Sequence, residues 1–339
     1  MTDSNLPAYI QALLRPEAYD HPVDEVRLVQ THISFVLLAG DYVYKFKKPV
    51  NFGFLDFSTL ARRHHCCEQE VRLNRRLCPD IYLGVIEVRR RDEVIGLDGT
   101  GEIIEYGVRM VRMPEDRMMV RVIEAGELRR EEIDAIVDVL VPFYRQAAHG
   151  REIDAFGTAS AVAVNVLENF DQTESFISDS GPLSREQFDR ISSYARRVLA
   201  REDLFEERIR AGRIRDCHGD LYSANICLAD KVYIYDCIEF NDRFRYCDVA
   251  SDVAFLAMDL DYHDLPGLSA HFIDRFGEQA GDGTLGTMLD FYKCYRAYVR
   301  GKIGLFTAAD PAVDEPVRQA SLDAAARYFR LADSYARRD

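Results

Sequence analysis

The sequence has 339 residues, of which 47% are hydrophobic and 29% charged, and its formal net charge is −14. This length and composition predict a soluble globular protein with two domains or one large bilobal domain. The acidic balance argues against binding to nucleic acid or to anionic membrane surfaces, because both attract cations. We therefore expect neither nucleic acid nor a membrane among the partners.

The lack of targeting signals and the pattern of cysteines also predict a soluble protein of a reducing compartment. The apolar runs are of strand length, and the first 20 residues lack a basic segment followed by a long apolar core. None of the eight cysteines forms a CxxC pair, and several lie in apolar segments, which is typical of buried reduced thiols. We expect a cytoplasmic protein.

The first third of the chain has the pattern of a sheet with one long helix. Strand-like segments fill 26–48, separated by short polar or glycine-containing turns, and two more follow at 82–90 and 102–113. Helical spacing predicts a short helix over 5–15 and a longer one over 58–78, with Ser58 as its N-cap.

The rest of the chain is mainly helical in pattern. It contains a loop with short strands at 217–236 and predicted helices at 129–149, 184–210, 267–280, 286–305 and 313–336. A β-rich N-terminal lobe (1–113) and an α-helical C-terminal lobe (114–339) together predict a bilobal α+β fold.

One polar cluster interrupts the apolar pattern, in the segment CHGDLYSANICL (217–228). The following NICLA and VYIYD predict a hairpin that places Asp220, Asn225 and Asp236 near one another. Two carboxylates and an amide oxygen are hard donors suited to Mg²⁺, and phosphoryl transfer from ATP needs such a set. The same residue types also cap ordinary turns. The spacing here is more specific: Asp220 is separated from Asn225 by four residues, and an apolar strand then ends at Asp236. This spacing favours a catalytic or metal-binding role.

This segment resembles the catalytic loop and metal aspartate of the aminoglycoside phosphotransferase family, which has a protein-kinase-like fold. The family pattern is H-G-D-x-x-x-x-N, followed by a strand that ends in I-D-[FW]. The resemblance implies that Asp220 is the catalytic base, that Asn225 and Asp236 are metal ligands, and that His218 braces the loop.

A second segment, YCDVASDVAFL (246–256), is similar to the family's DPxxDLA stretch. Its acidic positions, Asp248 and Asp252, are expected to steady the catalytic loop. The sequence departs from protein kinases at Gly219, where they have an arginine, and at Cys237-Ile238, where they have Phe-Gly. It also lacks an A-P-E segment. These departures favour a small-molecule kinase without a phosphorylation switch.

A lysine for the nucleotide phosphates is expected in DYVYKFKK (41–48). Strand alternation puts Tyr42, Tyr44 and Phe46 on a core face and both lysines on the other. Lys45 fits the small-x-Lys pattern of kinases and is the expected phosphate-binding lysine, with Lys47 as the alternative. The non-functional explanation is that both are ordinary solvated lysines at the end of a strand. On the 58–78 helix, the partner of the phosphate-binding lysine is expected to be Glu70, with Glu68 as the alternative.

The first 113 residues contain no G-x-G-x-x-G loop, and the sequence contains no Walker motif. In the family a serine-bearing turn commonly lies over the phosphates, and THIS (31–34) fits that role with Ser34. The adenine is expected against the backbone around Met113.

The acceptor is expected to be held by the helical lobe. Arg296 and Arg300 lie one turn apart and are either anion-binding residues or partners of loop carboxylates such as Asp252. The neighbouring tyrosines 292, 295 and 298 either stack on substrate or pack in the core, and further candidates are Asp259, Asp261, Asp264, Glu239 and Asn241.

The leading hypothesis is a kinase that uses ATP and Mg²⁺ to phosphorylate a hydroxyl of a small molecule. The acceptor would be an amino sugar, sugar, amino alcohol or aminoglycoside-like compound. An atypical protein kinase and a non-catalytic nucleotide-binding pseudokinase module are the alternatives. The sequence does not indicate the oligomeric state.

Overall fold

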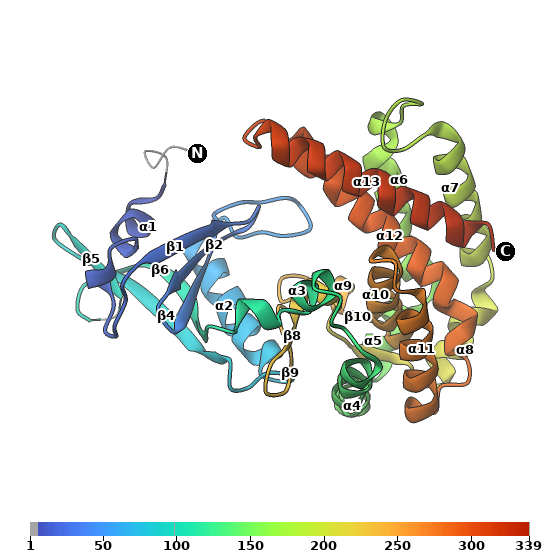
Figure 1. The fold of residues 1–339 in the computed structure, drawn as a ribbon, viewed down its shortest axis with the longest axis horizontal. Coiled ribbons are helices and arrows are strands. Elements are labelled where there is room, and N and C mark those ends of the chain that lie inside the picture. Colours follow the sequence, from blue (N-terminus) through green and yellow to red (C-terminus); the bar gives the residue numbers. More distant parts are fainter. Residues whose placement is uncertain (1–5, 98, 339) are drawn as a thin grey trace. The chain divides into compact units, whose positions relative to one another are not determined.

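The computed structural model describes residues 6–97 and 99–338. It divides into two compact units (Figure 1). The first comprises residues up to Met118 together with Cys227–Asp242, and the second comprises Met119–Ile226 together with the chain from Arg243. The first unit contains the large sheet and the second is mainly helical, so the predicted α+β, bilobal fold class is confirmed.

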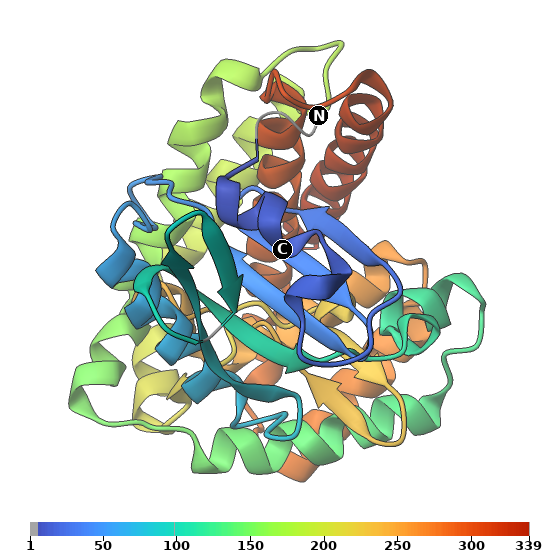
Figure 2. The ribbon, with the colours of Figure 1, turned by 90° about the vertical axis from the view of Figure 1, so that its left-hand side faces the viewer.

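A six-stranded antiparallel sheet dominates the first unit (Figure 2). Its strand order is β1-β2-β3-β6-β4-β5. Its strands are β1 (Val26–Gln30), β2 (Ser34–Ala39), β3 (Tyr42–Lys47), β4 (Tyr82–Arg91), β5 (Val94–Leu97) and β6 (Glu102–Val111). The short edge strand β5 was not predicted from the sequence.

The alternation expected in β3 is present. Tyr44 and Phe46 are buried in one core cluster of the unit, together with residues of α1 (Ala8–Leu13). Val43 packs in another core cluster, which contains residues of α2 (Leu60–Asn74). Because successive side chains point to opposite faces, Lys45 and Lys47 lie on the α2 side of the strand.

Helix α2 packs against β4 and β6. Its N-cap is Thr59, whose hydroxyl accepts a hydrogen bond from the Arg62 amide, so the assignment to Ser58 was wrong. The hydroxyl of Ser58 instead donates to Asp56 Oδ1 at 2.6 Å.

The hairpin formed by β8 (Ile226–Leu228) and β9 (Val232–Ile234) belongs to the sheet-containing unit. Cys227 and Tyr233 join the core cluster of Cys67, Val71 and Val108. The predicted division at residue 113 would have placed this hairpin in the helical lobe, whereas Cys227–Asp242 belongs to the first unit. The burial of the hairpin places Asp236, which follows β9, beside α2.

The second unit consists of helices around a small strand pair. The strands β7 (Ile214–Asp216) and β10 (Tyr246–Asp248) pair antiparallel. The helices are α3 (Met119–Glu124), α4 (Arg130–Gln146), α5 (Arg151–Asp154), α6 (Ala159–Thr173), α7 (Arg185–Leu199), α8 (Glu202–Arg210), α9 (Asp242–Arg245), α10 (Val249–Tyr262), α11 (Pro266–Ala280), α12 (Leu285–Ala309) and α13 (Glu315–Ala336). Helices α12 and α13, drawn in orange-red and red respectively, run side by side, and α10 packs on α12 (Figure 1).

Three helical features differ from the sequence-based expectation. The predicted helix over 184–210 is two helices, α7 and α8, separated at Ala200–Arg201. Helix α10 was missed because nearly all of it is buried, which removes the amphipathic period. Helix α6 was missed because the valines in AVAVNV recur every two residues, as in a strand. In the described part of the chain, no helix combines the length and apolarity that crossing a membrane requires.

Candidate active site

In the first unit, two lysines of β3 share one buried carboxylate. Glu70 on α2 is 1% exposed, and its two oxygens lie 2.9 Å from Lys45 Nζ and 2.8 Å from Lys47 Nζ. The alternative partner, Glu68, is exposed on the same helix and lies 3.7 Å from His64. The structure therefore brings Glu70 to both lysines.

Lys45 also forms an ion pair with Asp236. The Asp236 residue has a left-handed backbone (φ +62°), which is unusual for a residue with a side chain and is a form of local strain. Its carboxylate side chain remains 41% exposed, whereas Lys45 is 15% exposed. The pair thus has a buried cation and an anion that solvent or a ligand can reach.

Helix α2 and strand β4 hold the turn at Asp236. The amide of Asp236 donates to the hydroxyl of Tyr82 at 3.2 Å, and the amide of Cys237 donates to Asn74 Oδ1 at 2.9 Å. Asn74 lies one helical turn after Glu70 and donates to its carbonyl oxygen at 2.9 Å. One face of α2 therefore fixes both the lysines and the turn. Asn74 was not predicted from the sequence, where the spacing Glu70-x-x-x-Asn74 was the available signal.

Lys47 has a second partner that the sequence did not indicate. It forms an ion pair with Glu239, and both side chains are almost completely buried. Its ammonium also lies 4.8 Å from the centroid of the Phe57 ring, at a distance typical of a cation–π contact. Glu239, expected as a possible substrate contact, is thus part of the lysine cluster.

These contacts change the acidity of the cluster. Burial raises the pKa of Glu70, but Lys45 and Lys47 lower it more, to about 2. Burial lowers the pKa of Lys45, but Asp236 and Glu70 together raise it well above its usual value. Both lysines and Glu70 are therefore charged at neutral pH.

Two predicted nucleotide residues lie at the ends of strands in the same unit. Ser34 begins β2 and is 1% exposed, and its hydroxyl has no hydrogen-bond partner among the residues that the structure describes. The turn before it is held by Thr31, whose hydroxyl accepts from the Ser34 amide at 2.9 Å. Met113 follows β6 and packs partly against the core. Their roles toward a nucleotide stay predictions.

In the second unit, Asp252 holds the loop that begins at Cys217. This fully buried carboxylate on α10 accepts hydrogen bonds from the amides of His218 at 2.7 Å and Gly219 at 2.9 Å. Gly219 has φ +87°, a conformation that favours glycine. His218 is also fully buried, and its Nδ1 accepts from the Asp220 amide at 3.3 Å. His218 thus contacts the loop backbone, as expected for a bracing residue.

Asn225 orients Asp220 directly. Its side-chain amide donates to the carbonyl oxygen of Asp220 at 2.9 Å and to Asp220 Oδ2 at 3.0 Å. Between them, the amide of Ser223 donates to the carboxylate of Asp259 at 2.9 Å. The segment from His218 to Asn225 is therefore fixed at its start, middle and end.

Asp248 supports this loop indirectly, through helix α10. It caps α10 by accepting from the Ala250 amide at 2.9 Å, and it binds Arg208 through both oxygens at 2.7 and 2.9 Å. Arg208 also contacts Asp282 at 2.6 Å. Asp248 therefore fixes the helix that carries Asp252.

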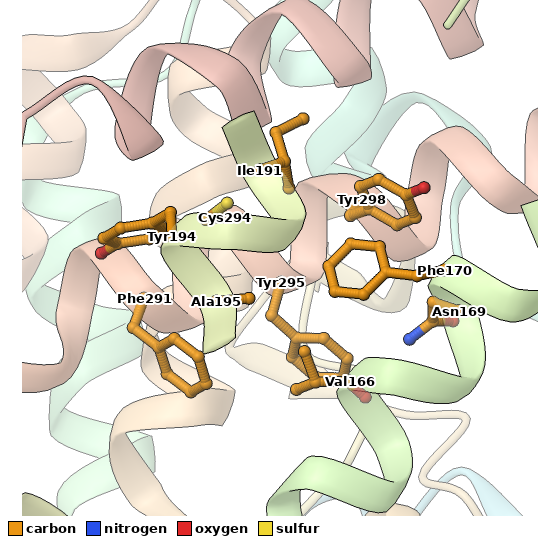
Figure 3. Close-up of a pocket in the computed structure, with 10 residues that line it drawn as sticks. All are labelled: Val166, Asn169, Phe170, Ile191, Tyr194, Ala195, Phe291, Cys294, Tyr295 and Tyr298. Atoms are coloured by element: carbon orange, nitrogen blue, oxygen red, sulfur yellow. The ribbon is translucent and has the colours of Figure 1, made fainter. Parts of the chain in front are cut away.

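Two of the residues expected to contact the substrate have structural roles instead: Arg296 contacts the loop before Asp220, and Tyr298 packs in the core. Arg296 donates to the carbonyl oxygen of Gly219 at 3.1 Å and lies 3.8 Å from Asp252, so its role is structural. Tyr298 is buried, and its hydroxyl lies 2.6 Å from that of Thr173. Together with Tyr295 it lines a pocket of about 10 Å³ among mainly apolar and aromatic side chains (Figure 3). That volume is about enough for one water molecule and excludes a sugar.

Over 6–97 and 99–338 no group of three or more histidine, cysteine, aspartate or glutamate side chains is placed to hold a metal ion. The assignment of Asn225 and Asp236 as ligands stays a prediction, since each is described within its own unit.

Comparison with known sequences gives relatives without an assigned activity. No protein-family model matches the chain. Proteins described as uncharacterized, from Mycobacterium tuberculosis and Mycobacterium bovis, are 36% identical to it over 287 residues, or 84% of this chain. The match covers 55% of each relative, so the chain spans about half the length of the curated relatives it matches.

Comparison with solved structures identifies the fold. A choline/ethanolamine kinase family protein from Mesorhizobium loti has a TM-score of 0.52 at 12% identity, covering 98% of both chains. Spectinomycin phosphotransferase, solved with ADP and spectinomycin, has a TM-score of 0.50 at 12% identity, covering 98% of this chain and 99% of that chain. Amicoumacin kinase, solved with AMP-PNP and Ca²⁺, has a TM-score of 0.52 at 11% identity, covering 96% and 92%. The chain therefore has the fold shared by the choline/ethanolamine kinase family and the antibiotic phosphotransferases, which confirms the resemblance at the level of the fold.

Proposed function

We propose that the chain is a phosphotransferase that transfers the γ-phosphate of ATP to a hydroxyl group of a small molecule. The observation that carries the proposal is the orientation of Asp220. Asn225 holds its carboxylate, and Asp252 holds the loop backbone immediately before it. An aspartate fixed by this many contacts is suited to receive a proton from a positioned hydroxyl group.

In this reaction Asp220 acts as the general base. It accepts the proton of the acceptor hydroxyl, whose oxygen forms the new bond to the γ-phosphorus. The bond from that phosphorus to the β,γ-bridging oxygen breaks, and this oxygen leaves with its electron pair on ADP. Catalysis of this kind depends mainly on positioning and on stabilisation of charge.

The donors present fit magnesium and nucleotide. Asp236 offers a carboxylate that is 41% exposed. The side-chain nitrogen of Asn225 is engaged by Asp220, which leaves its oxygen as the donor for a hard cation. When bound, Mg²⁺ supplies charge neutralisation at the phosphates. We assign Lys45 to the phosphates, because it is held by Glu70 and is more exposed than Lys47.

The proposal also draws on the solved neighbours. Two of the three were determined with a nucleotide, ADP or AMP-PNP, and their names describe kinases or phosphotransferases. At identities of 11–12%, the acceptor of a neighbour cannot be assigned to this chain.

A screen for phosphoryl transfer tests the proposal. The purified chain is incubated with ATP and Mg²⁺ and with sugars, amino sugars, amino alcohols or aminoglycosides, and ATP loss and phosphorylated product are both measured. We expect product with at least one acceptor, and no product when Mg²⁺ is omitted. Phosphorylation of added protein substrates alone would instead support the atypical protein kinase. ATP binding without transfer to any class would support the non-catalytic module.

A further inference from the structure

One arginine beside the Asp220 loop forms no ion pair with any carboxylate in the described part of the chain. Arg300 lies on α12, one helical turn after Arg296, which donates to the carbonyl of Gly219. The guanidinium carbon of Arg300 lies 4.7 Å from the centroid of the Tyr222 ring, and Tyr222 is two residues after Asp220. This face of α12 therefore lies against the loop that carries the proposed base.

Aromatic rings hold the guanidinium of Arg300 in place. Besides Tyr222, the ring of Tyr328 on α13 lies 5.7 Å from the guanidinium carbon. Tyr222 stacks on Phe255 with ring centroids 5.4 Å apart, and Tyr328 stacks on Tyr262 at 3.9 Å, both with interplanar angles of 11°. Aromatic contacts engage a guanidinium through its face. Tyr328 also accepts a hydrogen bond from Arg300, and the other N–H groups of the guanidinium can still bind an acceptor.

Two cations that precede Arg300 on α12 each have a carboxylate partner, whereas no ion pair of Arg300 is present among the described residues. Arg296 lies 3.8 Å from Asp252, and Lys293 lies 2.9 Å from Asp261. Among the residues described here, no carboxylate oxygen lies within 4.0 Å of the Arg300 guanidinium, and its buried Nε has no hydrogen-bond partner. A partly buried guanidinium is costly without an ion-pair partner, so an anion that binds here would stabilise Arg300.

The charge of Arg300 persists at all relevant pH values. Burial lowers its pKa, but Tyr222, Tyr328 and Asp220 raise it above its usual value. Arginine remains protonated in proteins, and its planar fork matches carboxylate and phosphate groups.

We propose that the acceptor is an anionic hydroxyl compound, and that Arg300 binds its carboxylate or phosphate group while Asp220 receives the hydroxyl proton. This inference rests on the proposed function and narrows it. Arg300 then determines specificity, because neutral and cationic acceptors leave the guanidinium without a partner. The transfer step itself is unchanged.

Matched acceptors and variants test this assignment. One set is glucose, glucosamine, glucuronate and glucose 6-phosphate. The other is glycerol, 3-amino-1,2-propanediol, glycerate and glycerol 3-phosphate. Within each set only the charged substituent and its attachment change, and comparison of carboxylate with phosphate identifies the anion. We expect the anionic members to have the highest kcat/KM.

The variant Arg300→Gln removes the charge. Because a hydrogen bond to a charged group contributes about 1.5–3 kcal/mol, we expect the KM of the anionic acceptor to rise by about 10–100-fold. The KM of ATP should stay unchanged, and Arg300→Lys should restore part of the loss. Arg185→Gln is the matched control, since Arg185 also lies over an aromatic ring, 5.3 Å from Phe188, but is exposed on α7.

The outcomes separate the two proposals. Preference for neutral or cationic acceptors, or an unchanged acceptor KM in Arg300→Gln, would overturn the role of Arg300 and leave the phosphotransferase intact. Failure of every acceptor to be phosphorylated would count against the proposed function. Calorimetric titration of the full chain with glycerate and with inorganic phosphate then decides the role of Arg300 separately. Equal affinity of the wild type and Arg300→Gln for both probes, or no binding to either, would overturn it.

Discussion

Replacement of Glu70 by glutamine removes the one carboxylate that both β3 lysines share. Glu70 is 1% exposed, and its oxygens lie 2.9 and 2.8 Å from the two ammonium groups. Loss of one partner of a buried ion pair costs about 3–5 kcal/mol, because it leaves a buried charge uncompensated. Glutamine keeps the size and one acceptor oxygen, and Asp236 and Glu239 remain. We therefore expect the lower end, about 3 kcal/mol of unfolding free energy at pH 7.

The pKa of Glu70 gives a similar magnitude. It falls from 4.5 to about 2 in the folded chain, and one pKa unit corresponds to about 1.4 kcal/mol, which together give about 3 kcal/mol. Since the pKa is lower in the folded state, this stabilisation is complete above about pH 4.5 and is lost as the pH falls through about 2. At pH 3 the difference between the wild type and Glu70→Gln should have shrunk to about 1.4 kcal/mol.

Urea denaturation at pH 7 and pH 3, followed by circular dichroism, measures both values. The control is Glu68→Gln on the same helix, where the side chain is 56% exposed and the change should stay within about 0.5 kcal/mol. A Glu70→Gln protein as stable as the wild type at pH 7 would refute this reasoning. So would a deficit that is the same at both pH values.

Two further predictions concern the nucleotide. Lys45→Met should raise the KM of ATP by about 10–100-fold, whereas Lys47→Met, whose side chain is only 2% exposed, should mainly lower the melting temperature; kinetics and thermal melting of both variants decide, and the reverse ranking would move the phosphate role to Lys47. Asp236→Ala should abolish the tightening of ATP binding by Mg²⁺, and a calorimetric titration in which the wild type shows no such tightening would contradict the assignment of Asp236.

Regular periodicity made part of the first unit predictable. The alternation in β3 separates Tyr44 and Phe46 from Lys45 and Lys47, and the structure has this separation. The resemblance to the family favoured Glu70, which precedes Val71 and Leu73, over Glu68, and Glu70 is the buried partner. These assignments depend on neighbours along one strand or one helix, which a sequence displays.

Contacts across long sequence separations were not predictable in the same way. Lys47 pairs with Glu239, 192 positions away, and nothing in either local pattern indicates the other residue. The left-handed backbone of Asp236 depends on Tyr82 and Asn74, which bind the turn only after the hairpin has packed. The two arginines of α12 lie one helical turn apart, and only the tertiary structure shows that Arg296 has a nearby carboxylate and that Arg300 has none within ion-pair distance among the described residues.

The most direct test of the central claim is the turnover of Asp220→Asn. Asparagine keeps the shape and one acceptor oxygen but cannot receive a proton. We predict a wild-type melting temperature and wild-type affinity for Mg²⁺-ATP, with turnover lower by about 10²–10⁴-fold, as expected on loss of a general base. All three quantities are measured on one preparation, with the acceptor identified in the screen. Turnover close to that of the wild type in a fully folded Asp220→Asn protein would contradict the proposed phosphotransferase mechanism.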